Sequence, residues 1–142
     1  MKPISVLIVD DDEIDRYLLR RDLKRTGLEA GTIECADGGE ALAFLEDYDA
    51  NKKKHGDGFP PQVVFLDINM PKVSGFDFLE AFDKMRRERD DYSTCVIMMF
   101  TSSAHPDDRE RATKFDFVRE FIVKGETPPE ELGAKVKAAL AG

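Results

Sequence analysis

Carboxylates stand directly after two apolar runs of the chain, at positions where burying a charge is costly. The runs are ISVLIV (residues 4–9) and VVFL (residues 63–66), and the carboxylates after them are Asp10, Asp11, Asp12 and Asp67. Carboxylates that gather in one place repel each other, so a shared site would need a cation. No Cys or His stands beside them, and a set of oxygen ligands favours a hard ion, Mg²⁺ or Mn²⁺.

Two further apolar runs end in hydroxyl groups and in an amine. CVIMMF (residues 95–100) is followed by Thr101, Ser102 and Ser103, and FIV (residues 121–123) is followed by Lys124. A divalent cation, a lysine and a hydroxyl around one aspartate would hold the oxygens of a phosphoryl group. Asp67 would then be the nucleophile that forms an aspartyl phosphate.

Each of these residues also has an ordinary interpretation. A single aspartate after a strand is usually a turn or helix cap, and VDDDE (residues 9–13) would suit the acidic start of a helix. Thr101 alone would be a loop hydroxyl, and Lys124 alone says almost nothing. The hypothesis of a shared site depends on the arrival of all these groups at one edge.

The pattern of the chain predicts elements that would bring these groups together. Continuous β-rich apolar runs are typical of strands covered on both faces, whereas apolar residues three or four apart indicate amphipathic helices. The predicted strands are 4–9, 32–35, 63–66, 95–100 and 121–123, and the predicted helices are 14–25, around 41–45 and 78–85, from Pro106, and around 132–140. This alternation favours an open parallel α/β sheet with helices on both faces, whose sites form beyond the carboxyl ends of the strands.

Composition narrows the classes of function. The 142 residues suit a single domain over residues 1–142, and we expect no output domain. The net charge of −8 argues against direct binding to nucleic acid. No apolar run approaches the ~20 residues of a membrane span, so we expect no membrane insertion and a cytoplasmic location.

Two other features have plain structural interpretations. Cys35 and Cys95 lie in apolar, strand-like contexts, and we expect small core residues rather than a disulfide or a metal pair. Residues 48–61 are polar and contain Gly, Pro and the basic run Lys52–Lys54. We expect this segment to be a solvated loop.

The sequence resembles the receiver domain of two-component response regulators over essentially its whole length. IVDDDE, FLDINMPKVSGFDFL, MMFTSS and FIVKG carry the resemblance, with Pro71 and Gly75 at the turn positions of the family. It implies a flavodoxin-like, doubly wound (βα)5 fold with a five-stranded parallel sheet in the order 2-1-3-4-5. The implied site comprises the phosphoacceptor Asp67, the metal ligands Asp10, Asp11, Asp67 and the Asn69 backbone carbonyl, and the phosphoryl-binding or switch residues Thr101, Ser102, Lys124 and Phe121.

The resemblance also implies a function. A sensor histidine kinase or a histidine phosphotransfer protein would donate a phosphoryl group to Asp67 with Mg²⁺ or Mn²⁺ bound, and the protein would relay it or bind a downstream target. Such a domain is a phosphoacceptor rather than a turnover enzyme. Within the family, the long polar segment 48–61 resembles single-domain regulators associated with bacterial phytochrome kinases.

Alternatives from other classes remain open at this point. A phosphatase or phosphotransferase with an aspartyl nucleophile would need a second carboxylate two residues on, where Asn69 stands. A degenerate receiver would serve only as a protein-interaction module, which the intact set of polar residues disfavours. A flavin site is disfavoured because acidic residues, not a Gly-rich turn, follow the first predicted strand.

Three positions depart from the pattern of the family. Gly125 follows the lysine where Pro is usual, and a cis bond there would cost about 3–4 kcal/mol, which leaves the shape of this loop open. Phe121 replaces the usual tyrosine and has no hydroxyl. KFDFVREF (residues 114–121) lacks the small residues usual before the fifth strand, so the surface there is expected to recognise a different partner.

Overall fold

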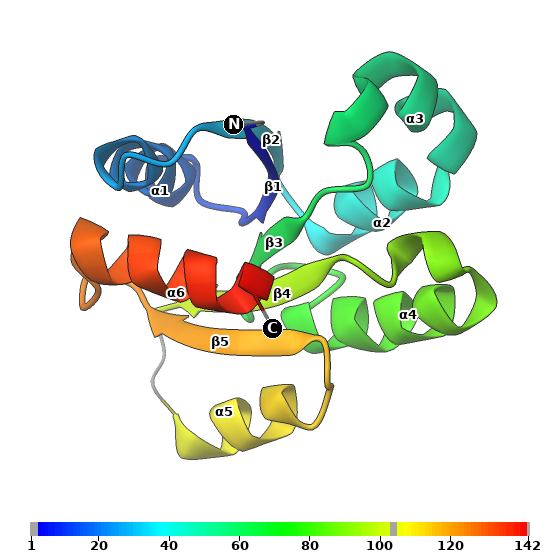
Figure 1. Ribbon diagram of the computed structural model, residues 1–142. Coiled ribbons are helices and arrows are strands. Elements are labelled where there is room, and N and C mark those ends of the chain that lie inside the picture. Colours follow the sequence, from blue (N-terminus) through cyan, green and yellow to red (C-terminus); the bar gives the residue numbers. More distant parts are fainter. Residues whose placement is uncertain (1–2, 103–104, 142) are drawn as a thin grey trace.

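The computed structural model describes residues 3–102 and 105–141, and within them five parallel strands form one sheet (Figure 1). The strands are β1 (Ile4–Val9), β2 (Ala30–Cys35), β3 (Val63–Leu66), β4 (Val96–Thr101) and β5 (Val118–Val123). Their order is β2-β1-β3-β4-β5, and every neighbouring pair is parallel. The predicted flavodoxin-like topology is confirmed.

Helices cover both faces of the sheet. The α-helices are α1 (Glu13–Arg25), α2 (Gly38–Glu46), α3 (Tyr48–His55), α4 (Gly75–Glu88), α5 (Pro106–Thr113) and α6 (Pro129–Ala141), and the 3₁₀ turns are η1 (Gly56–Gly58) and η2 (Asp90–Tyr92). Figure 1 shows α1 and α6 together on one side of the sheet and α2 and α4 together on the other. This arrangement leaves the carboxyl ends of the strands between the two layers of helices.

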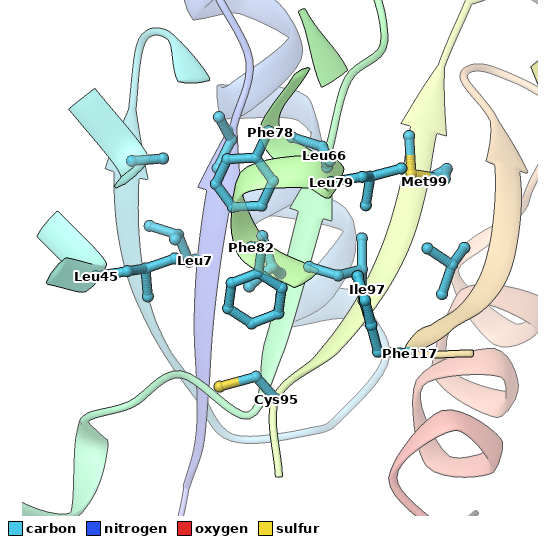
Figure 2. Packing of buried hydrophobic residues seen from close by; sticks show 14 of the residues in the cluster. Leu7, Leu45, Leu66, Phe78, Leu79, Phe82, Cys95, Ile97, Met99 and Phe117 are labelled. Carbon is cyan, nitrogen blue, oxygen red and sulfur yellow. The ribbon is translucent and has the colours of Figure 1, made fainter. Parts of the chain in front are cut away.

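Alternate residues of the strands belong to two separate cores. Val6 and Ile8 of β1 pack with α1 and α6, whereas Leu7 and Val9 pack with α2, α4 and the residues before β5. On the second face, Phe78 stacks on Phe82 with ring centroids 5.8 Å apart, and these residues lie over the sheet in Figure 2. Burying each such side chain contributes about 1.5–3 kcal/mol. Because both faces of the sheet are covered, the strands carry continuous apolar runs rather than alternating apolar and polar residues.

Local signals fix where the helices near the sheet edge begin. The Asp12 carboxylate accepts hydrogen bonds from the backbone N–H groups of Ile14 (2.9 Å) and Asp15 (3.3 Å), so it caps α1. Ser74 and Asp77 form a reciprocal capping box at the start of α4. These caps satisfy N–H groups that lack partners within the helix, and they fix the turns that leave the sheet edge.

The prediction of a loop over residues 48–61 is wrong, because residues 48–58 form α3 and η1. No residue of α3 is buried and its N-cap Asp47 makes no capping hydrogen bond, so the segment carries no apolar stripe that would reveal a helix. Tertiary contacts hold it instead. The Tyr48 ring packs on Phe59 at 5.3 Å, and the Lys52 ammonium donates to the Phe59 carbonyl at 2.9 Å.

Two strands are longer than predicted, because pairing extends them past their apolar residues. β2 begins at Ala30, opposite Ile4, rather than at Thr32. β5 begins at Val118, which pairs with Ile97 next to an irregularity in the register, rather than at Phe121. Both strands still end where the sequence predicts, so the residues at the carboxyl edge keep their predicted places.

The two cysteines are buried and unpaired, as predicted. Burial raises the pKa of each thiol to about 12, so neither is a thiolate at neutral pH. None of the helices in the described ranges is both long enough and apolar enough to cross a bilayer.

Candidate functional site

Parallel pairing brings the predicted residues to one edge of the sheet. Asp10 directly follows β1, Asp67 follows β3, Thr101 ends β4 and Lys124 follows β5. Backbone hydrogen bonds continue past the strands, from Asp67 N–H to the Val9 carbonyl (3.0 Å) and from Lys124 N–H to the Thr101 carbonyl (2.8 Å). The side chains are therefore positioned by the hydrogen-bonded ends of the strands.

Lys124 lies at the centre of the site and contacts three carboxylates. Its ammonium nitrogen is 2.6 Å from Asp10 Oδ2, 2.8 Å from Asp15 Oδ2 and 3.4 Å from Asp67 Oδ2. Burial lowers the pKa of Lys124, but the hydrogen bonds that its ammonium donates to Asp10 and Asp15 outweigh this effect, and the net pKa is raised. The lysine is therefore a fixed positive charge across the physiological pH range.

Asp67 is buried, with 6% of its surface exposed, and only part of its carboxylate is satisfied. Its Oδ2 faces Lys124, whereas its Oδ1 has no hydrogen-bond partner within the described residues. Burial raises the pKa of Asp67 and the Lys124 charge opposes the rise. A buried carboxylate oxygen without a partner is costly in a folded protein, so its presence here points to a ligand or to chemistry at this atom.

Asp10 is held more tightly than Asp67. Its Oδ1 accepts the Asp12 N–H at 2.9 Å, and its carbonyl accepts a hydrogen bond from the Arg16 guanidinium at 2.6 Å. Arg16 in turn pairs with Glu34 of β2 at 3.1 Å. Burial raises the pKa of Asp10, while its hydrogen bond with Lys124 lowers it.

The carboxylates fit a hard divalent cation. One oxygen each from Asp10, Asp11 and Asp67 lies within 4.8 Å of the others, with Asp11 exposed and the other two buried. All donors are carboxylate oxygens, the Asp67 carboxylate has an unpartnered Oδ1, and within the described residues Lys124 is the lysine that contacts the cluster. The chemistry of this donor set suits Mg²⁺ or Mn²⁺. The Asn69 carbonyl as a further ligand stays a prediction.

The predicted switch residues surround this centre in different ways. Thr101 is completely buried, and Ser102 beside it is exposed, whereas Ser103 lies outside the described residues. Phe121 is buried too, and the Arg109 guanidinium of α5 lies 5.9 Å from its ring centroid. The structure thus holds one inward position of the ring, and its movement stays a prediction.

The loop after β5 has its own shape at Gly125. The cis peptide bond among the described residues joins Phe59 to Pro60, so Lys124–Gly125 is trans. Gly125 takes a φ of 80°, in the left-handed region that favours glycine. The lysine nevertheless points into the site, with its ammonium nitrogen beside Asp10, Asp15 and Asp67.

Gly75 marks a close approach of α4 to the segment that carries Asp67. A Cβ added there would lie 2.5 Å from the Asp67 carbonyl oxygen and 2.8 Å from the Ile68 Cα. The Gly75 N–H also donates to the Ile68 carbonyl at 2.9 Å. Only glycine allows this contact, which fixes the backbone beside the candidate phosphoacceptor.

We expect Gly75→Ala to lower the free energy of unfolding by about 1–3 kcal/mol, since backbone atoms must move to admit the methyl group. Urea denaturation of the wild type and the variant measures this. Gly31→Ala is the matched control, because a Cβ there meets nothing within 4 Å. Equal losses for the two variants would show that the close contact at Gly75 has no energetic weight.

Sequence reasoning missed Asp15 and Arg16. Asp15 lies in the first turn of α1, where an acidic side chain is expected simply because it favours the helix dipole. Arg16 looked like one more charge on an exposed helix face. The only available signal was that the helix predicted from residue 14 begins next to the acidic run, so its first turn must lie close to the sheet edge.

A doubly wound parallel sheet with paired carboxylates, a buried aspartate, a threonine and a lysine at its carboxyl edge defines a specific class of α/β domain. The comparison with known families gives it a name. Residues 6–137 match the family model of the response regulator receiver domain, so the chain belongs to that family.

Relatives and solved structures agree with this assignment. The chain is 32% identical over 139 residues to the response regulator MprA of Mycobacterium sp. (strain KMS), covering 97% of this chain and 51% of MprA. It also covers 49% of the probable transcriptional regulator ycf27 of Porphyridium aerugineum, at 29% identity. The chain thus spans about half the length of these curated relatives.

Solved structures resemble the chain over nearly all its length. The Vibrio cholerae chemotaxis protein CheY4 is 28% identical with a TM-score of 0.70, and the match covers 98% of this chain and 100% of that one. The bacteriophytochrome response regulator RtBRR is 27% identical with a TM-score of 0.75, covering 99% and 80%.

Proposed function

We propose that this protein accepts a phosphoryl group on Asp67 and passes the signal to a partner protein. The single observation that supports this most is the buried, unpartnered Oδ1 of Asp67, beside a fixed lysine and an acidic pair. The donor would be a phosphohistidine on a sensor histidine kinase or on a histidine phosphotransfer protein, since receiver domains in general interact with such kinases.

In this mechanism Asp67 attacks the phosphorus in line with the leaving imidazole. A bond forms between the aspartate oxygen and phosphorus while the phosphorus–nitrogen bond of the donor breaks, and the electron pair stays on the imidazole nitrogen, which then takes up a proton. Lys124 supplies a fixed charge for the transferred oxygens, and the hydroxyl of Thr101 would donate a hydrogen bond to them.

Asp10, Asp11 and Asp67 would hold Mg²⁺ or Mn²⁺, with the Asn69 carbonyl as a further ligand. The carboxylates outnumber the positive charge of Lys124, and the cation, when bound, supplies further positive charge that balances them. The chain would be a phosphoacceptor rather than a turnover enzyme, because Asn69 stands where a phosphatase needs a general acid. The intact set of site residues disfavours a degenerate receiver.

The output would arise where the site meets β4 and β5. Thr101 ends β4, and the Phe121 ring is buried one strand away with Arg109 above it. A shift of Thr101 toward a phosphoryl group would change the space available to that ring and remodel the surface of α5 and β5. A downstream target protein would read this surface.

The setting follows from the same proposal. We infer a cytoplasmic regulator that acts either as a relay or as a direct binder of its target, the roles that the similarity to CheY4 and RtBRR suggests. A kinase of the bacterial phytochrome type is the partner class that the second match suggests.

Incubation with acetyl phosphate and Mg²⁺ tests the proposal. We expect one phosphoryl group per chain by intact mass spectrometry, released by hydroxylamine as an acyl phosphate should be, and no labelling in EDTA. A phosphomonoester assay under the same conditions addresses the enzyme alternative. Sustained turnover of the phosphomonoester, or no labelling at all, would contradict the proposed function.

A further inference from the structure

Asp15 is a third carboxylate on the lysine of the site, and it comes from a helix rather than from a strand end. We propose that Asp15 holds Lys124 at the rim of the site in the unphosphorylated protein and competes with the phosphoryl group for it. Asp15 is thus a positioning residue that biases the protein toward its unphosphorylated state. This inference rests on the proposed function of Asp67 as phosphoacceptor.

The distances show that Asp15 binds the lysine better than Asp67 does. Lys124 Nζ lies 2.8 Å from Asp15 Oδ2 but 3.4 Å from Asp67 Oδ2. An ammonium has three N–H donors, and three carboxylates face it, so oxygens arriving on Asp67 must displace or share an existing contact. The response of the site to phosphorylation therefore depends on which of these contacts Lys124 gives up.

Burial indicates that the contact with Asp15 is the one that yields. The side chain of Asp10 is 2% exposed and that of Asp15 is 30% exposed. If Lys124 left Asp10, a buried carboxylate would lose its counter-charge, which is strongly unfavourable. Asp15 can take up water instead, because Asp15 and Lys124 both line an open groove between α1 and the segment after β5.

Charge acts in the same direction as geometry. An acyl phosphate on Asp67 carries close to two negative charges in place of the one on the carboxylate, at a lysine that already contacts the carboxylates of Asp10 and Asp15 and beside the Asp11 carboxylate of the acidic cluster. Removing the Asp15 charge should therefore favour the loaded state both by releasing Lys124 and by reducing repulsion. Because Asp15 belongs to α1, the exchange would also undo an ion pair that ties α1 to the end of β5.

The affinity for beryllofluoride, a stable mimic of the phosphoryl group, tests this proposal. In saturating Mg²⁺ we expect Asp15→Asn to lower the Kd of beryllofluoride by about three- to five-fold relative to wild type, the scale of a partly exposed ion pair. Asp15→Glu keeps the charge and should stay close to wild type. Glu13→Gln removes an exposed carboxylate in the same turn, and it is the matched control for a general charge effect.

The direction of the change separates this role from a structural one. If Asp15 only supported the fold, Asp15→Asn would lower the melting temperature and weaken ligand binding together, whereas competition predicts tighter binding even when the unliganded melting temperature falls. If the wild type binds beryllofluoride and Asp15→Asn leaves the Kd unchanged or raises it, this inference alone is overturned. An equal tightening in Glu13→Gln would overturn it too, and absence of binding by every variant would overturn the proposed function with it.

Discussion

Asp67→Asn should abolish incorporation of a phosphoryl group from acetyl phosphate, with labelling reduced below detection in a time course that saturates the wild type. The amide keeps the size of the side chain but has no anionic oxygen to form the acyl phosphate. It also removes one of the three carboxylates that form the candidate cation site. Both losses occur at a carboxylate whose Oδ1 has no hydrogen-bond partner among the described residues.

The fold should survive this substitution. Asp67 is buried and its pKa is raised by that burial, so a neutral amide avoids the cost of desolvating a charge. Lys124 loses only its longest contact, at 3.4 Å, and keeps Asp10 and Asp15. We expect the free energy of unfolding to change by no more than about 1 kcal/mol, as urea denaturation would measure.

Asp83→Asn is a suitable control for the labelling experiment. Asp83 lies on α4, where it pairs with Arg87 at 3.5 Å, and it is not one of the residues of the candidate site. It should label like the wild type. Full labelling of Asp67→Asn at another residue, located by peptide mapping, would show that the phosphoacceptor has been assigned to the wrong aspartate.

The central part of the site could be predicted because it depends on strand ends. A covered parallel strand is recognisable as a short continuous apolar run, and its last residue marks the sheet edge within narrow limits. Asp10, Asp67 and Lys124 each follow such a run directly. The structure places the two carboxylates beside the lysine. Only the sheet order was needed to bring them into contact, and it followed from the family resemblance.

The parts that sequence reasoning missed depend on contacts between distant segments. α3 has no apolar stripe and is held by the rings of Tyr48 and Phe59, so its own residues do not predict it. Asp15 resembles any acidic residue in the first turn of a helix until Lys124, more than a hundred residues later, is placed beside it. Such pairings become visible only when the register of the helix against the sheet is known.

Lys124→Met should have the second large effect, a loss of about 3 kcal/mol in the free energy of unfolding at neutral pH, measured by urea denaturation. Lys124 is the ion-pair partner of Asp10 and Asp67 among the described residues, and both of these carboxylates are buried. Removing it leaves two buried anions close together without a counter-charge. The methionine keeps the apolar stem beside Phe100, whose ring centroid lies 5.6 Å from the ammonium nitrogen.

The loss should depend on pH in a direction that the raised pKa values determine. Burial already raises the pKa of Asp10 and of Asp67, and the lysine opposes the rise at both. Without Lys124 the folded protein binds protons at these two carboxylates more readily than the unfolded chain does. The loss in the free energy of unfolding is therefore fully present at pH values well above the raised folded-state pKa. The loss shrinks as the pH falls through that value toward the pKa of the unfolded chain, so it should be smaller in acidic buffer than at neutral pH.

Added Mg²⁺ should restore part of the stability of Lys124→Met, and should stabilise this variant more than the wild type, because a cation on Asp10, Asp11 and Asp67 replaces the missing charge. Lys137→Met removes an exposed lysine of α6 and controls for the change in net charge. If Lys124→Met were as stable as this control at neutral pH, the two buried carboxylates would not need the lysine. The site would then hold them by hydrogen bonds and protonation, and the role of Lys124 as the fixed charge for a phosphoryl group would lose its energetic basis.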